Sequence, residues 1–303
     1  MGTGGVGGYF GGRLAQAGAQ VHLIARGEHL KSLREKGLRV KSVKGDFDIS
    51  LPATDDPAEV GACDFVLFTV KAFHTQSAAS QLDPLIGSDT AVVSLQNGVD
   101  NEDAIAAAVG AAHVMGGIAY IFAEIDEPGV IAHTGGPASL EFGEMDGTRS
   151  ERADRLLGQC VAAGVDAEVS ADIRAGLWSK FVFICAVAGT TSAVRLPLGD
   201  IRSTPHSWEM FSRILEEVNA VAAAEGVRLP DDLVARNMAF AESLEPDSYS
   251  SLHFDMTHGR PMEVEALHGT VVRLGRKHGL PVPMCEAVHA VLKPWAVRNK
   301  TPD

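Results

Sequence analysis

The sequence predicts an α/β domain followed by an all-α domain, and three observations support this fold class. Apolar runs of strand length alternate with helix-like segments throughout the first half of the chain. From about Ala171 onward, the residues show helical spacing and no convincing strand pattern. At 303 residues, the chain is also longer than one ordinary domain. We therefore expect a boundary near residue 170, which divides the chain into residues 1–170 and 171–303.

Strands in the first domain are predicted from short apolar runs flanked by turn residues. Their continuous hydrophobicity is typical of a mostly parallel sheet that helices cover on both faces. The expected strands are residues 21–25, 65–70, 91–95, 114–121 and 130–132. The expected helices are residues 9–17, 74–86 and 151–163, the last of which ends at Gly164.

Helices in the second domain are predicted from apolar residues at helical spacing. One helix carries such residues over positions 211–221, with Ser207 as its expected N-cap and Gly226 just beyond its C-terminus. A later helix carries them over positions 264–274, and we expect it to end at Gly279.

The composition excludes several classes of protein. Hydrophobic residues make up 46% of the chain, which excludes a wholly disordered protein, and the net charge of −13 argues against binding to a nucleic-acid backbone. No run of about 18 uninterrupted apolar residues occurs, so we expect no membrane-spanning helix. No secretory signal is visible, which favours the cytoplasm. The cysteines and histidines lack metal-ligand spacing, so we expect reduced thiols and no metal site.

The first residues contain a G-x-G-x-x-G motif formed by Gly2, Gly4 and Gly7. A helix and then a strand follow it, as in the first βαβ unit of a Rossmann-type dinucleotide-binding fold. There the glycines let the backbone approach a pyrophosphate, which the free N–H groups of the helix N-terminus bind. The sequence therefore predicts a dinucleotide cofactor held by Gly2, Thr3, Gly4, Gly5, Val6 and Gly7.

The strand that should precede this loop is missing, because Met1 directly abuts Gly2. In such sheets this strand is central, and its absence would leave the edges of two inner strands unpaired. We therefore expect that the native protein carries several more residues upstream. Mass spectrometry of the native N-terminus tests this expectation, and a mature chain that begins at Met1 or Gly2 would contradict it.

The end of the second strand selects between the two nicotinamide dinucleotides. NAD-binding folds place an acidic residue there, on the ribose 2′-hydroxyl. This chain has Arg26 at that position, with Lys31 nearby, and a guanidinium suits a 2′-phosphate. NADP(H) is therefore favoured over NAD(H). The alternative is that Arg26 is an ordinary solvated residue.

Three polar residues are candidate site residues because they end or interrupt apolar runs. Lys71 and Asn97 each follow a predicted strand, at the edge where open α/β sheets bind ligands. Lys180 lies in an apolar helix, where burial would lower its pKa and suit it to donate a proton. The alternatives are ordinary loop residues for the first two and a side chain that reaches water for Lys180. Glu263 and Ser251 are further polar candidates, which the sequence alone cannot bring near Lys180.

Five ordered segments carry a resemblance to one known family, and they read GTGGVGGYFGGRLAQAGAQVHLIARGEHL, TVKAF, SLQNGVDNE, LWSKF and SSLHFDM…HGRPMEVE. Together they resemble the ketopantoate reductase (2-dehydropantoate 2-reductase) family over nearly the whole chain. The resemblance implies a Rossmann domain joined to a helical domain. It also implies NADPH-dependent reduction of ketopantoate to pantoate, on the route to pantothenate and coenzyme A.

The resemblance also implies roles for the residues at matching positions. The loop from Gly2 to Gly7 and Arg26 would hold the phosphates of NADPH. Lys71 and Asn97 would face the nicotinamide end, and Asn97 would also touch the substrate. Lys180 would be the general acid, Ser251 would bind the substrate, and Glu263 would contact the cofactor and the catalytic lysine.

The chain departs from the family at three substrate-binding asparagines, which are replaced by Ile184, Ala188 and Leu198. Each lost polar contact would remove roughly 1 kcal/mol or more of binding free energy. We therefore expect a reductase of ketopantoate, the best single guess, or of a bulkier or less polar ketoacid.

Two other functions stay open: a 3-hydroxy acid dehydrogenase, and an NADP(H)-binding sensor without turnover. The expected partner is a small-molecule 2-oxoacid, with no nucleic acid and no membrane. A homodimer formed through the helical domain also stays open.

Overall fold

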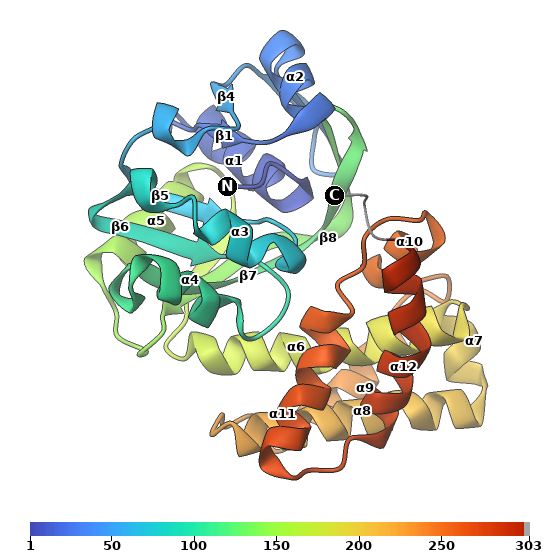
Figure 1. Cartoon of the computed structure of the whole chain (residues 1–303). Coiled ribbons are helices and arrows are strands. Elements are labelled where there is room, and N and C mark those ends of the chain that lie inside the picture. Colours follow the sequence, from blue (N-terminus) through green and yellow to red (C-terminus); the bar gives the residue numbers. More distant parts are fainter. Residues whose placement is uncertain (300–303) are drawn as a thin grey trace. The chain divides into compact units, whose positions relative to one another are not determined.

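The computed structural model describes residues 1–299 and divides into two compact units. The α/β unit consists of Met1–Gln96 and Asp100–Gly176, and the helical unit consists of Asn97–Val99 and the chain from Leu177 onward. Figure 1 labels the elements of both units. The predicted fold class, an α/β domain followed by a helical domain, is confirmed.

The strands of the α/β unit form two hydrogen-bonded groups. Their bounds are β1 Leu23–Ile24, β2 Leu38–Ser42, β3 Phe47–Ile49, β4 Ala53–Thr54, β5 Cys63–Phe68, β6 Ile86–Ser94, β7 Val114–Glu127, β8 Val130–Glu144 and β9 Asp166–Val169. The first group is the pair β1–β4. The second is a seven-stranded sheet in the order β3-β2-β8-β7-β6-β5, with β9 paired to β8.

Most neighbouring strands run parallel, as the sequence predicts. The exceptions among the described residues are the antiparallel pairs β2–β3 and β7–β8. The β7–β8 hairpin turns at Gly129, whose φ of +86° is readily adopted by glycine. Its strands are longer than the predicted residues 114–121 and 130–132. The part of β7 beyond residue 121 is partly exposed and mixes polar with apolar residues, and in β8 the stretch from His133 to Pro137 interrupts the apolar pattern before the buried Leu140 and Phe142.

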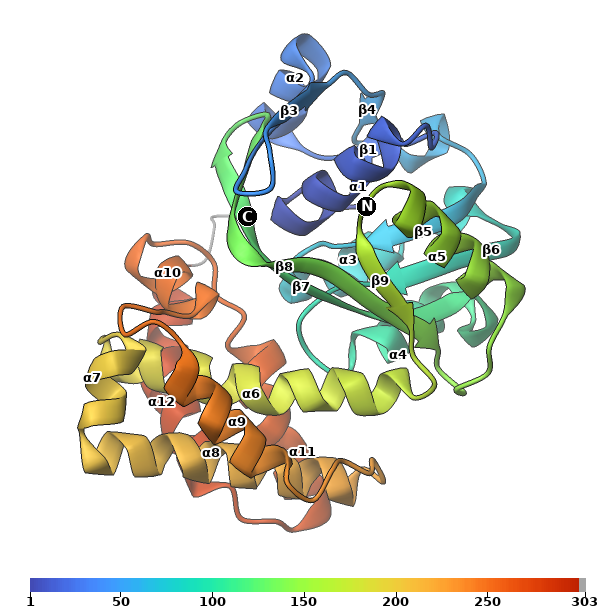
Figure 2. The same cartoon turned by 180° about the vertical axis from the view of Figure 1, so that it is seen from behind.

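Helices cover both faces of the larger sheet, as Figures 1 and 2 show from opposite sides. Both faces need cover because β6 buries apolar side chains on each of them, since successive side chains of a strand point to opposite faces of the sheet. Ala91 and Val93 join one buried cluster, and Val92 joins another. The helices of this unit are α1 Gly5–Gln16, α2 Gly27–Lys36, α3 Thr75–Ala79, α4 Asn101–Val109 and α5 Glu151–Ala162.

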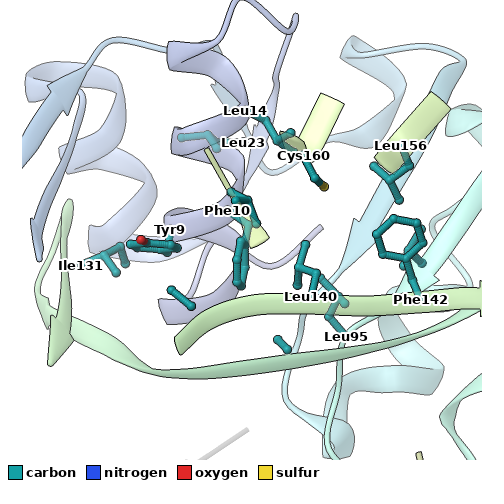
Figure 3. Close-up of a cluster of buried hydrophobic side chains, with 14 of the residues drawn as sticks. Tyr9, Phe10, Leu14, Leu23, Leu95, Ile131, Leu140, Phe142, Leu156 and Cys160 are labelled. Atoms are coloured by element: carbon teal, nitrogen blue, oxygen red, sulfur yellow. The ribbon is translucent and has the colours of Figure 1, made fainter. Parts of the chain in front are cut away.

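The cluster beneath α1 and α5 is the larger core of this unit. Figure 3 shows Phe10 of α1 and Leu156 of α5 gathered with Leu140 and Phe142 of β8. The opposite cluster joins side chains of α3 and α4 to β5 and β6. The predicted helix over 74–86 is reduced to α3 and the 3₁₀ turn Asp83–Leu85, because Pro84 cannot continue a helix.

The first three residues link the two groups of strands. The Met1 amine donates to the Leu67 carbonyl at 2.9 Å, and the Thr69 N–H donates back to the Met1 carbonyl at 2.9 Å. On the other side, the N–H groups of Gly2 and Thr3 both donate to the Ile24 carbonyl at 3.0 Å. Met1–Thr3 therefore lies between the end of β1 and the end of β5.

The helical unit is built around α8, whose apolar face is fully buried from Phe211 to Ala222. Gly226 follows its C-cap with a φ of +79°, as expected, but the predicted N-cap at Ser207 is wrong. The N-cap is Thr204, because Pro205 suits the first helical position. The remaining elements are α6 Ile173–Val194, α7 Leu198–Ser203, α9 Leu233–Ser243, α10 Ser251–Thr257, the π-helical turn η5 Glu265–Gly269, α11 Thr270–His278 and α12 Pro283–Arg298.

Within residues 1–299, α6 is the one helix that is long and apolar enough to cross a membrane by length and composition. The sequence analysis predicts no such helix, because charged and polar residues interrupt its apolar run. Of its most apolar window, 61% is buried inside the protein, which is typical of the core helix of a folded domain.

Candidate active site

The glycine loop has the close backbone packing that a dinucleotide-binding turn requires. Gly2 has a φ of +91°, and a Cβ there would lie 2.8 Å from the backbone nitrogen of Val70. A Cβ on Gly7 would lie 2.5 Å from the Gly2 carbonyl oxygen. By contrast, a Cβ on Gly4 would meet no described atom within 4 Å. The loop is therefore packed on its inner side and open at Gly4.

The loop leads directly into α1, whose N-cap is Gly4. Because the first N–H groups of a helix have no intrahelical acceptor, those of Gly5, Val6 and Gly7 are available to an anion. The Thr3 hydroxyl donates inward to the Ile24 carbonyl at 3.1 Å and fixes the turn. The open space at Gly4 and the helix N-terminus together fit the pyrophosphate of a dinucleotide.

Arg26 follows β1 and is the N-cap of α2. Its exposed guanidinium donates to Oε1 of Gln81 at 3.3 Å. Its positive charge also adds to the effect of burial in lowering the pKa of His74. Arg26 therefore lies where the sequence predicts it, at the carboxyl end of the strand that follows the glycine-loop helix.

Lys71 lies three residues after β5, where it is the exposed N-cap of the 3₁₀ turn Ala72–His74. Asn97 lies three residues after β6 and is partly exposed. Both residues thus follow parallel, paired strands, as predicted, although each strand ends earlier than expected.

A buried amide beside Asn97 joins these two strand ends, and the sequence analysis missed it. Gln96 Nε2 donates to the Val70 carbonyl at 2.8 Å and to the Thr75 hydroxyl at 2.7 Å. The Thr75 hydroxyl in turn donates to Oδ1 of Asn101 at 3.2 Å. The available signal was an amide placed directly after an apolar strand, where an unpaired polar group would be costly.

Glu102 is a second buried residue that the sequence analysis missed. It lies in the first turn of α4 and is only 4% exposed. Burial raises the pKa of its carboxyl group to about 7, and the nearby charges of Asp100 and Asp103 act in the same direction. A carboxyl group that is partly protonated at neutral pH therefore lies at the start of α4, five residues after Asn97 in the sequence.

Lys180 and Glu263 both belong to the helical unit, and the charge of Glu263 acts on Lys180. Lys180 is partly exposed as a whole residue, but its ammonium group is enclosed, and burial lowers its pKa to about 8. The Glu263 carboxylate opposes this shift and raises the pKa of Lys180. Glu263 itself is 8% exposed. A lysine with this pKa is protonated at neutral pH and gives up its proton readily.

Ser251 is the first residue of α10 and is exposed. The residue before it, Ser250, is the N-cap and accepts a hydrogen bond from the N–H of His253 at 3.1 Å. Its hydroxyl also lies 2.8 Å from that of Thr191, which donates to the Val187 carbonyl at 2.6 Å. This chain of bonds ties the start of α10 to α6, the helix that carries Lys180.

The three residues that replace family asparagines differ in exposure. Ile184 follows Lys180 by four residues on α6, so the two share a helix face, and it is partly exposed. Ala188, four residues further, is 2% exposed, and Leu198 is fully buried. Of the three residues, Ile184 is therefore the one whose side chain can contact a ligand without a change in the surrounding packing.

The open glycine loop at the start of a mostly parallel sheet and an enclosed lysine on a helix define a dinucleotide-binding oxidoreductase. Two family models identify it further: ketopantoate reductase PanE/ApbA matches residues 1–147, and its C-terminal counterpart matches residues 172–296. The chain therefore belongs to the ketopantoate reductase family, as the resemblance implies, and is an oxidoreductase that acts on keto and hydroxyl groups.

Individual relatives agree with this assignment. The chain is 33% identical to a 2-dehydropantoate 2-reductase of Mesorhizobium japonicum, with 99% of this chain and 97% of the relative covered. It is 31% identical to an uncharacterised oxidoreductase of Bacillus subtilis, with 97% and 96% covered. A crystal structure of a PanE/ApbA family ketopantoate reductase from Ralstonia eutropha matches with a TM-score of 0.91, 34% identity and coverage of 99% and 98%.

A more distant similarity extends to a different dehydrogenase. The structure of a D-mandelate dehydrogenase with NADH and anilino(oxo)acetate matches with a TM-score of 0.90, 24% identity and coverage of 99% and 98%. At this identity the match shows the shared fold alone.

Proposed function

We propose that this protein catalyses the NADPH-dependent reduction of a 2-oxoacid to the 2-hydroxyacid, with 2-dehydropantoate as the best single candidate. The enclosed Lys180 beside Glu263 is the observation that carries the proposal. Ketone reduction needs a proton for the developing alkoxide, and an ammonium group both stabilises that charge and delivers the proton. The proposed pathway is pantothenate biosynthesis in the cytoplasm.

In the proposed reaction, different residues bind the cofactor, donate the proton and orient the substrate. The Gly2–Gly7 loop binds the pyrophosphate, and Lys71 and Asn97 bind at the nicotinamide end. NADPH, when bound, supplies a hydride to the keto carbon. Lys180 gives its proton to the carbonyl oxygen, which becomes the hydroxyl group, while Glu263 keeps the lysine protonated before that step. Asn97 and Ser251 orient the substrate.

The preference for NADPH rests on Arg26. Its guanidinium is exposed at the end of β1, where it can form charge-assisted hydrogen bonds with a 2′-phosphate. Arg26 therefore favours the phosphorylated dinucleotide, whereas an acidic residue at this position would repel it.

The identity of the 2-oxoacid depends on the helix face beyond Lys180. Ile184 is partly exposed there and offers no hydrogen bond. This favours a substrate that is less polar than 2-dehydropantoate, or bulkier, as the second candidate. A cofactor-binding sensor without turnover is less consistent with an enclosed lysine beside a carboxylate. Product analysis with 2-oxo and 3-oxo acids separates the proposed reaction from the reduction of a 3-oxo acid.

The initial rate of NADPH oxidation, followed by absorbance with 2-dehydropantoate as substrate, tests the proposal. Rapid and saturable consumption would support the pantothenate-pathway reaction. If NADPH binds tightly but is not consumed, a panel of bulkier 2-oxoacids separates the second candidate from a sensor. No reaction with any 2-oxoacid would contradict the proposed function.

A further inference from the structure

Lys180 and Glu263 lie on separate elements of the helical unit, and their spacing depends on how those elements are joined. Glu263 lies just before the π-helical turn η5, in which the N–H of Gly269 donates to the Val264 carbonyl five residues back, at 3.0 Å. By contrast, the N–H of Leu267 donates to the Glu263 carbonyl four residues back, at 3.1 Å. Such π-turns are rare and frequently occur at functional sites.

His268, within this turn, makes a direct hydrogen bond to α6. The residue is fully buried, and its Nε2 donates to the Cys185 carbonyl at 2.9 Å. Cys185 lies five residues beyond Lys180 on the same helix. The bond therefore attaches the turn that follows Glu263 to the helix that carries Lys180.

Gly189 gives the imidazole room on α6. A Cβ at this position would lie 2.5 Å from Nε2 of His268 and 3.1 Å from its Cε1. Any larger residue would therefore displace the ring or the helix. Since glycine inside a helix costs about 1 kcal/mol relative to alanine, its presence here is explained by the space that the ring needs.

His268 is unsuited to acid–base chemistry itself. Burial lowers its pKa to about 4, the Cys185 carbonyl opposes this shift, and the charge of His289 acts with burial. His289 is in turn bonded to Glu265, as is Lys293. The Nδ1 atom of His268 has no hydrogen-bond partner within residues 1–299. The ring is therefore neutral at physiological pH, and its contribution is geometric.

We propose that His268, seated against Gly189, is a positioning residue that holds Glu263 close enough to Lys180 to keep the lysine protonated. The hydrogen bond from Nε2 of His268 to the Cys185 carbonyl holds the π-helical turn at one position along α6. The close approach of the ring to Gly189 limits how far the turn can move across the surface of that helix. The charge of Glu263 raises the pKa of Lys180, so moving that carboxylate away changes the lysine directly. This inference rests on the proposed role of Lys180 as proton donor.

The protonation of Lys180 can be measured without cofactor or substrate. The protein is labelled with ¹³C at the lysine ε-carbons and titrated by NMR, and Lys180→Met identifies the Lys180 resonance. In His268→Phe and Gly189→Ala, we expect the midpoint of Lys180 to fall by about half a pH unit or more, because the carboxylate moves away. His268→Gln, which keeps a donor, should restore the midpoint nearly to that of the wild type.

His278→Phe is the matched control, because it removes a histidine bonded to Glu225 at 2.5 Å in the same unit. It should leave the Lys180 midpoint unchanged. Gly189→Ala retains the imidazole and improves helix propensity, so it carries the test if His268→Phe fails to fold. An unchanged midpoint in a folded Gly189→Ala protein overturns the proposal.

Turnover provides a second and separable readout. Well above pH 8, where turnover follows the protonated fraction of Lys180, we expect kcat to fall about threefold or more in His268→Phe and Gly189→Ala, with the NADPH dissociation constant changed less than twofold. If the midpoint shifts but the wild type reduces no 2-oxoacid, the proposed function fails and the positioning role stands. If the wild type is active and the midpoint does not shift, the positioning role fails alone.

Discussion

Gln96 Nε2 lies 2.8 Å from the Val70 carbonyl oxygen, so one buried side chain joins the segments that follow β5 and β6. The same nitrogen also bonds to Thr75 at 2.7 Å. Lys71 and Asn97, the two residues expected at the nicotinamide end, are each directly adjacent in sequence to one partner of this bond. The backbone of Val70, which precedes Lys71, is therefore held by a residue that contacts neither ligand in the proposed mechanism.

Replacing Gln96 should weaken both the fold and cofactor binding. In Gln96→Leu, the Val70 carbonyl and the Thr75 hydroxyl lose a buried partner, so we expect the free energy of unfolding to fall by roughly 1–3 kcal/mol. We also expect a several-fold rise in the NADPH dissociation constant. Chemical denaturation and fluorescence titration measure the two effects. Gln159→Leu, at an exposed position on α5, is the control, and equal effects in both variants would refute this role.

Lys180 should control the alkaline limb of the pH–rate profile. Reduction requires the protonated amine, and its pKa is about 8, so kcat/KM should be level below that pH and fall tenfold per unit above it. Lys180→Ala should lower turnover by about 10²-fold or more with nearly unchanged NADPH affinity, whereas Lys36→Ala on exposed α2 should change neither. Equal losses of turnover and NADPH affinity would argue against a proton donor.

Glu102 should make the α/β unit less stable as the pH rises. Its pKa is about 7 in the folded protein and near the ordinary 4.5 in the unfolded chain. A raised pKa of this kind gives stability that is fully present below pH 4.5 and is lost as the pH rises to about 7.

The isosteric variant Glu102→Gln removes this dependence. Above pH 7 its free energy of unfolding should exceed that of the wild type by up to roughly 3 kcal/mol, since one pKa unit corresponds to about 1.4 kcal/mol. Denaturation at pH 5 and pH 8 measures the difference. Glu151→Gln, in the exposed first turn of α5, should show no such trend. A Glu102→Gln variant that parallels the wild type across this range would disprove the effect.

The sequence was most informative where local chemistry decides the structure. The glycine motif predicted the packed turn at Gly2 and Gly7, and continuous apolar runs predicted β5 to within two residues at each end but only the last four residues of β6. The helix end at Gly226 followed from the need for a positive φ. In each case the signal lies within a few neighbouring residues.

The features that sequence reasoning missed depend on partners far away in the chain. Gln96 matters because Val70 and Thr75 fold against it, and His268 matters because Gly189 leaves it room. The pairing of Lys180 with Glu263 was a family expectation that spacing alone could not supply. Ser207 has the side chain of an N-cap, but α8 begins earlier, at Pro205, because proline suits the first helical turn.

Arg26 should decide between the two nicotinamide dinucleotides. Arg26→Ala should raise the dissociation constant of NADPH about tenfold or more, because a charge-assisted hydrogen bond contributes roughly 1.5–3 kcal/mol. Binding of NADH should change little, so the ratio of the two constants is the measurement. Arg155→Ala, on the exposed side of α5, controls for the loss of one positive charge. A preference for NADPH that survives in Arg26→Ala would place the phosphate-binding group elsewhere.

Ile184 should set the polarity of the substrate. It shares a face of α6 with Lys180 and is partly exposed. Ala188 and Leu198 are buried, so an amide introduced at either position would lack a hydrogen-bond partner. Ile184→Asn should therefore raise kcat/KM for 2-dehydropantoate and lower it for phenylpyruvate, and the ratio should move by about tenfold.

The control for this substitution is Ile184→Val, which keeps an apolar side chain and should leave the ratio nearly unchanged. Competition between the two substrates at one enzyme concentration measures the ratio directly and cancels differences in the active fraction. If Ile184→Asn and Ile184→Val give the same ratio, the α6 face does not select the substrate. Selection would then fall to Asn97 and Ser251, the remaining polar residues proposed to bind it.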